Sequence, residues 1–414
     1  MSDGMQNLQK LKTEDIDRAA VRLRGVLHET PLQRSNTFSE MAGCEVYLKY
    51  ENLQKTGSFK IRGAYNKISE LLEQENGNKK IESVVASSAG NHAQGVAYAA
   101  QRLGIRSVIV MPKITPIAKV KATEGYGAEV LLHGAVYDDA YDRAMEIHKE
   151  SGAEFIHPFN DLAVIAGQGT IGHDILQALP NVDVVLVPAG GGGLLAGTAF
   201  YLKSINPRVK VIGVQAEGAS AIKQSFETKS FVTLPLVNTI ADGIAVKVPG
   251  DITTDIINEY ADDIVTVSDS EISSAILYLL ERSKQMVEPA GAAALAAALS
   301  GKLDLSGKRC VSVLSGGNID VSFVHRIIEV GLIERKRKLK FRTIMKDVPG
   351  SLEKFAKIMA DSQANVVMIQ YDRMSAELDP QEVILHVACE VGDEAHGAKV
   401  LEKLEENDYK VIME

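Results

Sequence analysis

The sequence predicts an α/β protein with mostly parallel sheets, followed by a small ferredoxin-like module. From about residue 80 to 330, short apolar runs alternate with amphipathic stretches, a pattern typical of buried parallel strands separated by helices. Beyond residue 334 the order becomes strand, helix, strand, strand, helix, strand. That β-α-β-β-α-β order is the ferredoxin-like arrangement.

The predicted strands of the first part are short and dominated by apolar residues, as expected of strands that are covered on both faces. They span 84–86, 107–111, 129–132, 184–187, 209–214 and 310–314. Amphipathic stretches between them predict helices at Asn91–Leu103, Val164–Ala178 and Ser270–Lys284. Because the alternation extends over so many residues, we expect more than one parallel sheet.

The second module follows a short basic run. Its predicted strands and helices span 340–345, 351–362, 365–371, 382–389, 394–407 and 410–413. We therefore expect a first domain over 1–333, with a smaller subdomain inserted at about 50–157. A linker over 334–338 then leads to a second domain over 339–414.

Composition limits the classes of function. The 414 residues carry a net charge of −9, which argues against a nucleic-acid partner, since such a partner requires a basic face. Three widely separated cysteines favour neither a disulfide framework nor a zinc site. The polar N-terminus predicts no secretory signal, and no uncharged run approaches the length of a membrane span. We therefore expect a cytoplasmic protein without a membrane partner.

Lys60 is the first candidate for chemistry. Most lysines are solvated surface charges, but Lys60 lies between the apolar Phe59 and Ile61 and follows a loop-like stretch. A lysine in an apolar pocket loses hydration, so its pKa falls and its neutral amine can attack a carbonyl carbon. We expect Arg62 to lower the pKa further by like-charge repulsion.

A run of four glycines, Gly190 to Gly193, follows a predicted strand and precedes a helical pattern that begins near Leu194. Backbone N–H groups in such a turn converge on an anion, and the helix N-terminus adds a favourable dipole. Residues 191–196 also match the G-x-G-x-x-A pattern of dinucleotide-binding folds. A match of this kind is weak on its own, so we interpret the loop as a phosphate site and keep a dinucleotide as the alternative.

A second strand-to-helix turn contains Ser88, Ala89, Gly90, Asn91 and His92. Its small residues and hydroxyl groups can bring several donors to a carboxylate at the helix N-terminus. Simple N-capping explains the same pattern, and spacing alone does not decide between the two. The position of His92 just inside the helix favours a structural role over a catalytic one.

Ser315 ends the predicted strand at 310–314, at the edge of a parallel sheet where ligands bind. A lysine amine, a phosphate cradle and a partner for a ring nitrogen are together what a pyridoxal-phosphate site requires. A neutral hydroxyl facing the pyridine nitrogen leaves the ring unprotonated. That arrangement favours elimination over transamination.

With these motifs the chain resembles the fold-type II pyridoxal-phosphate enzymes, whose fold is similar to that of the tryptophan synthase β subunit. Within that group it resembles the threonine ammonia-lyases (threonine dehydratases) that carry one C-terminal ACT-like domain. The resemblance rests on Ser58–Ala64, the four-glycine loop and Leu314–Asn318. It extends over nearly the whole chain and implies a catalytic domain followed by a regulatory ACT-like domain.

The resemblance also implies roles for individual residues. Lys60 carries the cofactor pyridoxal 5′-phosphate covalently, Phe59 lies beside its ring and Ser315 faces the ring nitrogen. Asn91 forms a hydrogen bond with the 3′-hydroxyl group. The implied phosphate-binding residues are Gly190, Gly191, Gly192, Gly193 and Leu194. The implied residues around the substrate carboxylate are Ser88, Ala89, Gly90, Asn91 and His92.

The implied reaction is deamination of L-threonine to 2-oxobutanoate and ammonia by β-elimination of the hydroxyl group, with a side activity on L-serine. An L-serine dehydratase or serine racemase stays open as an alternative, and a non-catalytic amino-acid sensor is a remote third. Racemases of this fold carry a serine base at the position of Ala89. Because alanine neither accepts nor delivers a proton, elimination should dominate.

Relatives in this group also bind a divalent metal, and part of that site is changed here. Glu217 is present, but Lys223 stands where a second carboxylate is expected. We therefore expect no dedicated divalent metal.

The turn from Asp347 through Val348, Pro349, Gly350 and Ser351 to Leu352 joins the first strand and helix of the second module. It is a well-formed turn in any ferredoxin-like domain, and it also resembles the amino-acid-binding loop of ACT domains. The resemblance implies an effector such as isoleucine or valine. It also implies a homo-oligomer, either a tetramer or a dimer. Whether the role is isoleucine biosynthesis or threonine catabolism stays open.

Overall fold

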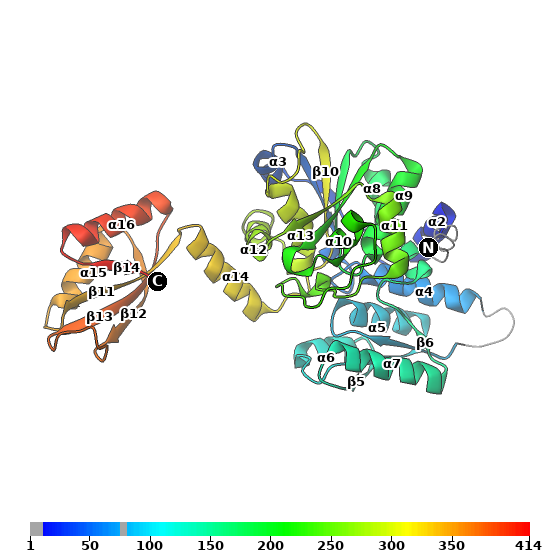
Figure 1. Ribbon diagram of the computed structural model, residues 1–414, viewed down its shortest axis with the longest axis horizontal. Coiled ribbons are helices and arrows are strands. Elements are labelled where there is room, and N and C mark those ends of the chain that lie inside the picture. The colour runs from blue at the N-terminus through cyan, green and yellow to red at the C-terminus, as the bar shows by residue number, and fades with distance from the viewer. Residues whose placement is uncertain (1–10, 75–80) are drawn as a thin grey trace. The chain divides into compact units, whose positions relative to one another are not determined.

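The computed structural model describes residues 11–74 and 81–414, which divide into two compact units between Ile319 and Asp320. The first unit contains a larger and a smaller sheet, and the second unit contains one sheet (Figure 1). The contact boundary precedes the domain end expected at 333, because helix α14 (Val321–Glu334) is grouped with the second unit.

The larger sheet has six strands in the order β1-β2-β10-β7-β8-β9. All neighbours in it are parallel except β1, which pairs antiparallel with β2. The strands are β1 (Leu32–Arg34), β2 (Glu45–Tyr50), β10 (Arg309–Leu314), β7 (Val184–Pro188), β8 (Lys210–Ala216) and β9 (Asp263–Val267).

Several helices accompany this sheet, and α9 and α13 are apolar on all sides and buried. The helices are α2 (Thr13–Leu23), α3 (Asn36–Ala42), α8 (Leu162–Ala178), α9 (Gly193–Ile205), α10 (Ala221–Thr228), α11 (Asp251–Tyr260), α12 (Asp269–Tyr278) and α13 (Pro289–Leu299). The prediction of a single α-helix over Ser270–Lys284 was wrong about its C-terminal part. Helix α12 ends at Tyr278, and a π-helical turn over Leu279–Ser283 follows it.

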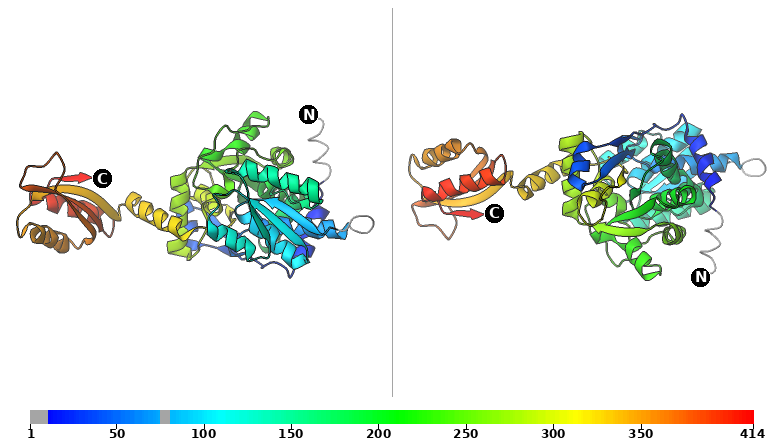
Figure 2. Two further views of the ribbon diagram at one scale, coloured as in Figure 1. Left: turned by 90° about the horizontal axis from the view of Figure 1, so that it is seen from below. Right: turned by 90° about the horizontal axis from the view of Figure 1, so that it is seen from above.

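The smaller sheet has four parallel strands in the order β5-β4-β3-β6. They are β3 (Ser83–Ser87), β4 (Arg106–Met111), β5 (Glu129–Leu132) and β6 (Glu154–Phe155), and their helices are α4 (Lys60–Glu73), α5 (Asn91–Leu103), α6 (Ile117–Glu124) and α7 (Tyr137–Ser151). Figure 2 shows this layer in cyan beside the green and yellow larger layer. In sequence, these elements all lie between β2 and β7. The prediction of more than one parallel sheet is confirmed.

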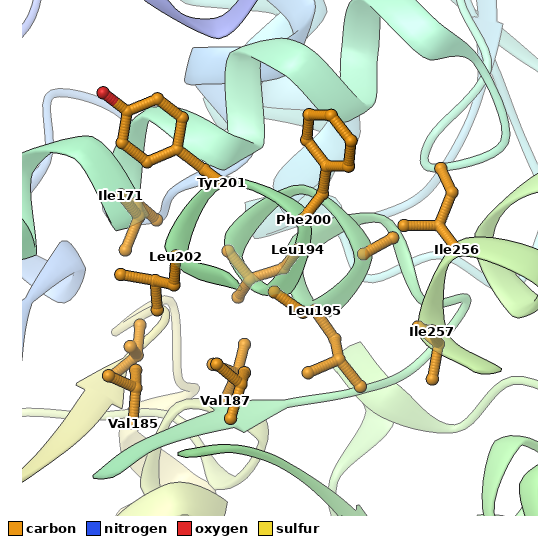
Figure 3. Packing of buried hydrophobic residues seen from close by; sticks show 14 of the residues in the cluster. Ile171, Val185, Val187, Leu194, Leu195, Phe200, Tyr201, Leu202, Ile256 and Ile257 are labelled. Carbon is orange, nitrogen blue, oxygen red and sulfur yellow. The ribbon is translucent and has the colours of Figure 1, made fainter. Parts of the chain in front are cut away.

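The core beneath the four-glycine loop is built by helix α9 on strand β7. Leu194, Leu195 and Leu202 of α9 lie against Val185 and Val187 of β7 (Figure 3). All five side chains are less than 5% exposed. Burial of a leucine or valine side chain contributes about 1.5–3 kcal/mol, so this contact anchors the N-terminus of α9 where the loop enters it.

The second unit follows the predicted β-α-β-β-α-β order and is therefore ferredoxin-like. Its strands are antiparallel neighbours in the order β12-β13-β11-β14. The elements are β11 (Lys338–Lys346), α15 (Ser351–Asp361), β12 (Asn365–Asp372), β13 (Glu382–Glu390), α16 (Glu394–Glu406) and β14 (Val411–Met413). Every second residue of β11 is buried, as period-two alternation requires of a sheet with one covered face.

No helix in the part of the chain that the structure describes is long and apolar enough to cross a membrane.

Glycines allow helices α4, α8 and α9 of the first unit to approach closely. Helix α4 packs on α8, and α8 packs on α9. A methyl group added to Gly167 of α8 would lie 2.4 Å from the carbonyl oxygen of Arg62 in α4. One added to Gly197 of α9 would lie 2.3 Å from the carbonyl oxygen of Ile165 in α8. Both contacts are with backbone, which cannot move aside as a flexible side chain can.

We expect Gly197→Ala to lower stability by about 1–3 kcal/mol through overpacking, even though alanine favours a helix by about 1 kcal/mol. The midpoint of urea unfolding measures the change. Gly397→Ala in α16 is the matched control, since its added methyl would lie 3.4 Å from the nearest atom, a side-chain carbon of Leu339. A higher midpoint for Gly197→Ala than for the unmodified chain would contradict the packing argument.

Candidate active site

Two distant segments of the chain meet at Lys60. Lys60 is the first residue of α4, and the backbone just before it pairs with the turn that follows β10. The Phe59 N–H donates to the carbonyl of Ser315 at 3.0 Å, and the Gly317 N–H donates to the carbonyl of Gly57 at 2.8 Å. The structure thus brings together Lys60 and Ser315, which the sequence analysis selected separately.

The Lys60 amine lies in a poorly hydrated position. Its Nζ atom donates to the carbonyl of Pro158 at 2.8 Å and lies 5.3 Å from the centre of the Phe59 ring. Burial lowers the pKa of Lys60 to about 8, although the Glu288 carboxyl group opposes this shift. A larger share of the amine is therefore neutral and nucleophilic near neutral pH than in an exposed lysine.

The expectation that Arg62 lowers the pKa of Lys60 was wrong. Arg62 is buried, and its guanidinium donates to Glu51 and Asp174, each at 2.8 Å. Burial lowers the pKa of Arg62, but these two carboxylates raise it above its usual value. Because its charge is compensated within this ion pair, Arg62 joins α4 to α8 and to the turn after β2 instead of perturbing Lys60.

The four-glycine loop lies between β7 and α9 as predicted. Gly192 has φ +95°, and a methyl group on Gly191 would lie 2.3 Å from the Phe159 ring. The carbonyl of Gly191 accepts from the Thr253 hydroxyl at 2.7 Å and from the Gly250 N–H at 3.2 Å. The N–H groups of Gly190, Gly191 and Gly192 donate to no residue that the structure describes. They are available to an anion at the N-terminus of α9.

The turn over Ser88–His92 lies between β3 and α5, also as predicted. The Gly90 N–H donates to the Ser88 hydroxyl at 3.3 Å. His92 is buried, and its Nε2 atom donates to the carbonyl of Ile156 at 2.8 Å. Burial, with a contribution from Lys60, lowers the pKa of His92 to about 3. A neutral ring held by a backbone carbonyl supports the structural role expected for His92.

Glu288, the residue before α13, also belongs to the site and was not predicted from the sequence. The Asn91 Nδ2 atom donates to Glu288 Oε1 at 2.6 Å, and Glu288 is buried. Burial raises the pKa of Glu288 to about 8. A carboxylate between apolar neighbours in Val287-Glu288-Pro289 was the available signal. Its meaning depends on contacts with Asn91 and Gly316, which no local pattern reveals.

A family model described as pyridoxal-phosphate dependent enzyme matches residues 23–316. The chain belongs to this family. Pyridoxal phosphate is therefore its cofactor, and the four-glycine loop and the Lys60 amine fit the phosphate and the aldehyde of that cofactor. The fit rests on unpaired N–H groups at a helix N-terminus and on an amine with a lowered pKa.

Individual members of this pyridoxal-phosphate family resemble the chain over most of its length. An L-threonine ammonia-lyase of Thermotoga maritima is 47% identical over 96% of this chain and 98% of that protein. Among solved structures, threonine deaminase isoform 2 of Solanum lycopersicum covers 79% of this chain and 92% of its own, with a TM-score of 0.70 and 37% identity. The structure of maize serine racemase covers 79% of this chain and 99% of its own, with a TM-score of 0.73 and 34% identity.

The positions named for a divalent metal are engaged in ion pairs. Glu217 lies 3.5 Å from the Lys302 ammonium, and Lys223 lies 3.0 Å from Glu227. Within residues 11–74 and 81–414, no three histidine, cysteine, aspartate or glutamate side chains are grouped as a metal site requires.

The turn over 347–352 lies in the second unit, between β11 and α15. Asp347 accepts from Arg373 Nε at 2.7 Å and from Nη2 at 3.2 Å. Gly350, at φ +91°, precedes the first residue of the helix, Ser351. Leu352 is 38% exposed.

We expect the rate at which the cofactor-free protein binds pyridoxal phosphate to rise about tenfold from pH 6 to 7. Below the pKa of an amine, its neutral fraction increases about tenfold with each pH unit. The rate should level off above about pH 8, the lowered pKa of Lys60. Stopped-flow absorbance measures it. Pyridoxine phosphate, which lacks the aldehyde, is the control for phosphate binding. A rate still rising tenfold per pH unit at pH 9.5 would contradict the lowered pKa.

Proposed function

We propose that this chain is a pyridoxal-phosphate dependent lyase that converts L-threonine to 2-oxobutanoate and ammonia. The observation that carries the proposal is the junction at Lys60, where a partly buried amine, the Ser315 strand end and the turn at the start of α5 lie together. The similarity to the Thermotoga maritima ammonia-lyase, which covers nearly both chains, supports the choice of substrate.

The residues selected from the sequence would hold the cofactor. Lys60 would carry it covalently beside Phe59, and the loop from Gly190 to Leu194 would bind its phosphate. Asn91 would bind the ring hydroxyl. Ser315 would face the ring nitrogen with a neutral hydroxyl group, which favours elimination. When bound, the cofactor supplies an aldehyde for the substrate amine and an electron-poor ring that stabilises negative charge at Cα.

The chain's own groups would bind and deprotonate the substrate. The N-terminal turn of α5, over Ser88–His92, would receive the substrate carboxylate, since the positive end of a helix favours an anion. Lys60, once released by the substrate amine, would remove the Cα proton. The carbonyl of Pro158, which accepts from Lys60 Nζ at 2.8 Å, offers this amine a fixed partner. The β-hydroxyl group would take up a proton and leave as water, and hydrolysis of the released product would then yield 2-oxobutanoate and ammonia.

L-Serine would react by the same route and yield pyruvate. Serine racemase is the second candidate, favoured by the structural similarity to the maize racemase. A racemase needs a proton donor on the face opposite Lys60, and Ala89 supplies none at the position named for it. Elimination is therefore the reaction that this residue supports.

The second unit would regulate the enzyme as an ACT-like domain. Its ferredoxin-like topology and the glycine-containing turn at 347–352 support this proposal. An amino acid such as isoleucine or valine would bind at that turn through Asp347, Pro349, Gly350, Ser351 and Leu352. The assembly would be a tetramer or a dimer.

We expect the purified protein to turn over L-threonine faster than L-serine and to form no D-serine. Lys60→Ala should lower turnover by at least about 1000-fold, because one group both carries the cofactor and moves the proton. The visible absorbance of the lysine-bound cofactor should disappear with it. The rate of oxo-acid formation measures the two eliminations, and chromatography on a chiral phase detects D-serine. Activity retained in Lys60→Ala would contradict the assignment, and D-serine formation would favour the racemase.

We expect isoleucine or valine to change the threonine concentration for half-maximal rate, and Asp347→Ala to remove this response. Turnover without effector should stay unchanged, since Asp347 lies in the second unit. Asp379→Ala, an exposed aspartate of the same unit, is the control. Initial rates at several effector concentrations measure the effect. If Asp347→Ala responds as the unmodified enzyme does, the effector does not bind at this turn.

A further inference from the structure

The side chain of Asn91 lies in a chain of hydrogen bonds between two acceptors. The Asn318 Nδ2 atom donates to the Thr56 carbonyl and to Asn91 Oδ1, each at 2.7 Å. The Asn91 Nδ2 atom then donates to Glu288 Oε1 at 2.6 Å. One continuous chain of hydrogen bonds thus joins residues from four separate parts of the sequence, and the Asn91 amide lies between Asn318 and Glu288 in it.

The Thr56 carbonyl at one end of this chain and the Glu288 carboxyl group at the other determine how the Asn318 and Asn91 amides are oriented. A backbone carbonyl only accepts, so Thr56 requires the NH2 group of Asn318 and not its oxygen. That NH2 group also faces Asn91, so the Asn91 oxygen must accept. The Asn91 NH2 group is left to face Glu288. One of its two N–H bonds is used there, and the other is free for a ligand.

Glu288 is built into this position. It is 5% exposed, and its own N–H donates to the Gly316 carbonyl at 3.0 Å. A methyl group on Gly316 would lie 2.2 Å from Glu288 Oε1, so a larger residue there would displace the carboxyl group from its present position. The backbone bond to Gly316 and the Asn91 N–H donor together hold this buried side chain in one orientation.

The charged groups around Glu288 come from three other elements. Burial raises its pKa to about 8, and the Asp242 carboxylate adds to this, while Asn91 and the ammonium groups of Lys119 and Lys60 oppose it. The carboxyl oxygen accepts from Asn91 in either protonation state. Its charge, however, changes near pH 8.

We propose that Glu288 is a positioning residue for the cofactor, which orients the Asn91 amide so that one N–H stays available for the ring hydroxyl of pyridoxal phosphate. The inference rests on the proposed role of Asn91. Glu288 acts through Asn91, so its contribution should vanish when Asn91 is removed.

The test is a double-mutant cycle on the full-length protein, with cofactor affinity as the readout. We expect Glu288→Ala to weaken pyridoxal-phosphate binding about 10-fold, because a buried N–H loses its acceptor. In an Asn91→Ala background the same change should weaken it less than about 2-fold, as coupled sites require. Glu227→Gln, at an exposed position in α10, is the control for loss of one carboxylate.

Glu288→Gln separates orientation from general packing. Its amide oxygen can still accept from Asn91, so affinity should return to within about 2-fold of the unmodified protein. The visible absorbance of the bound cofactor should change between pH 7 and 9 in the unmodified protein, since Glu288 ionises there. That change should be absent in Glu288→Gln. Asn318→Asp, which cannot donate to Asn91, serves if Glu288→Ala does not fold, and it should also weaken binding about 10-fold.

Three results would overturn the proposal. Equal losses from Glu288→Ala with and without Asn91 would show that the two side chains act separately. A Glu288→Gln variant as weak as Glu288→Ala would exclude the acceptor role. If Asn91→Ala weakens cofactor binding but neither Glu288→Ala nor Asn318→Asp does, then Glu288 has no positioning role, while the proposed role of Asn91 stands. Normal binding by Asn91→Ala would instead overturn the proposed role of Asn91, and with it the basis of the inference.

Discussion

The short backbone pairing between Gly57–Phe59 and Ser315–Gly317 is the constraint on which the site depends. It joins the start of α4, which packs on α5 beside the smaller sheet, to the end of β10 in the larger sheet. The pairing requires glycine on both sides. Gly57 has φ +71°, and a methyl group on Gly317 would lie 2.8 Å from the Met286 carbonyl. These backbone contacts fix the position of Lys60 independently of the contacts that its side chain makes.

Two neighbouring cations show how partners decide the behaviour of a buried charge. Lys60 and Arg62 begin the same helix, yet burial lowers the pKa of Lys60 while Arg62 keeps its charge. The difference is that Arg62 donates to Glu51 and Asp174, whereas Lys60 donates to a neutral carbonyl. Two carboxylates more than offset the desolvation of Arg62, whereas Glu288 offsets that of Lys60 only in part. Sequence spacing places the two residues together but does not reveal their partners.

The parts of the fold that sequence predicted are those determined by local pattern. Helix α5 spans Asn91–Leu103 as predicted, and the second unit follows the predicted order. Strand β2 was missed because Glu45 and Lys49 interrupt its apolar residues, and pairing with β10 supplies what the pattern lacks. The site divides in the same way. Strand-to-helix turns have a local signature, whereas the acceptors Glu288 and Pro158 are recognised only through contacts with distant residues.

Burial drives the titratable groups around Lys60 toward their neutral forms. It lowers the pKa of His92 to about 3 and that of His157 to about 4, and it raises that of Glu288 to about 8. In the proposed function, Ser315 would place a neutral hydroxyl group where an acid would carry charge. In such a setting the two histidines are much weaker bases than the Lys60 amine, whose pKa is near 8, whereas Glu288 has a pKa in the same range as Lys60. Charge is instead confined to ion pairs such as Arg62 with Glu51, and the unpaired N–H groups of the glycine loop remain the place for an anion. In the proposed elimination, proton transfer would therefore take place at Lys60 and the cofactor phosphate would bind at the glycine loop.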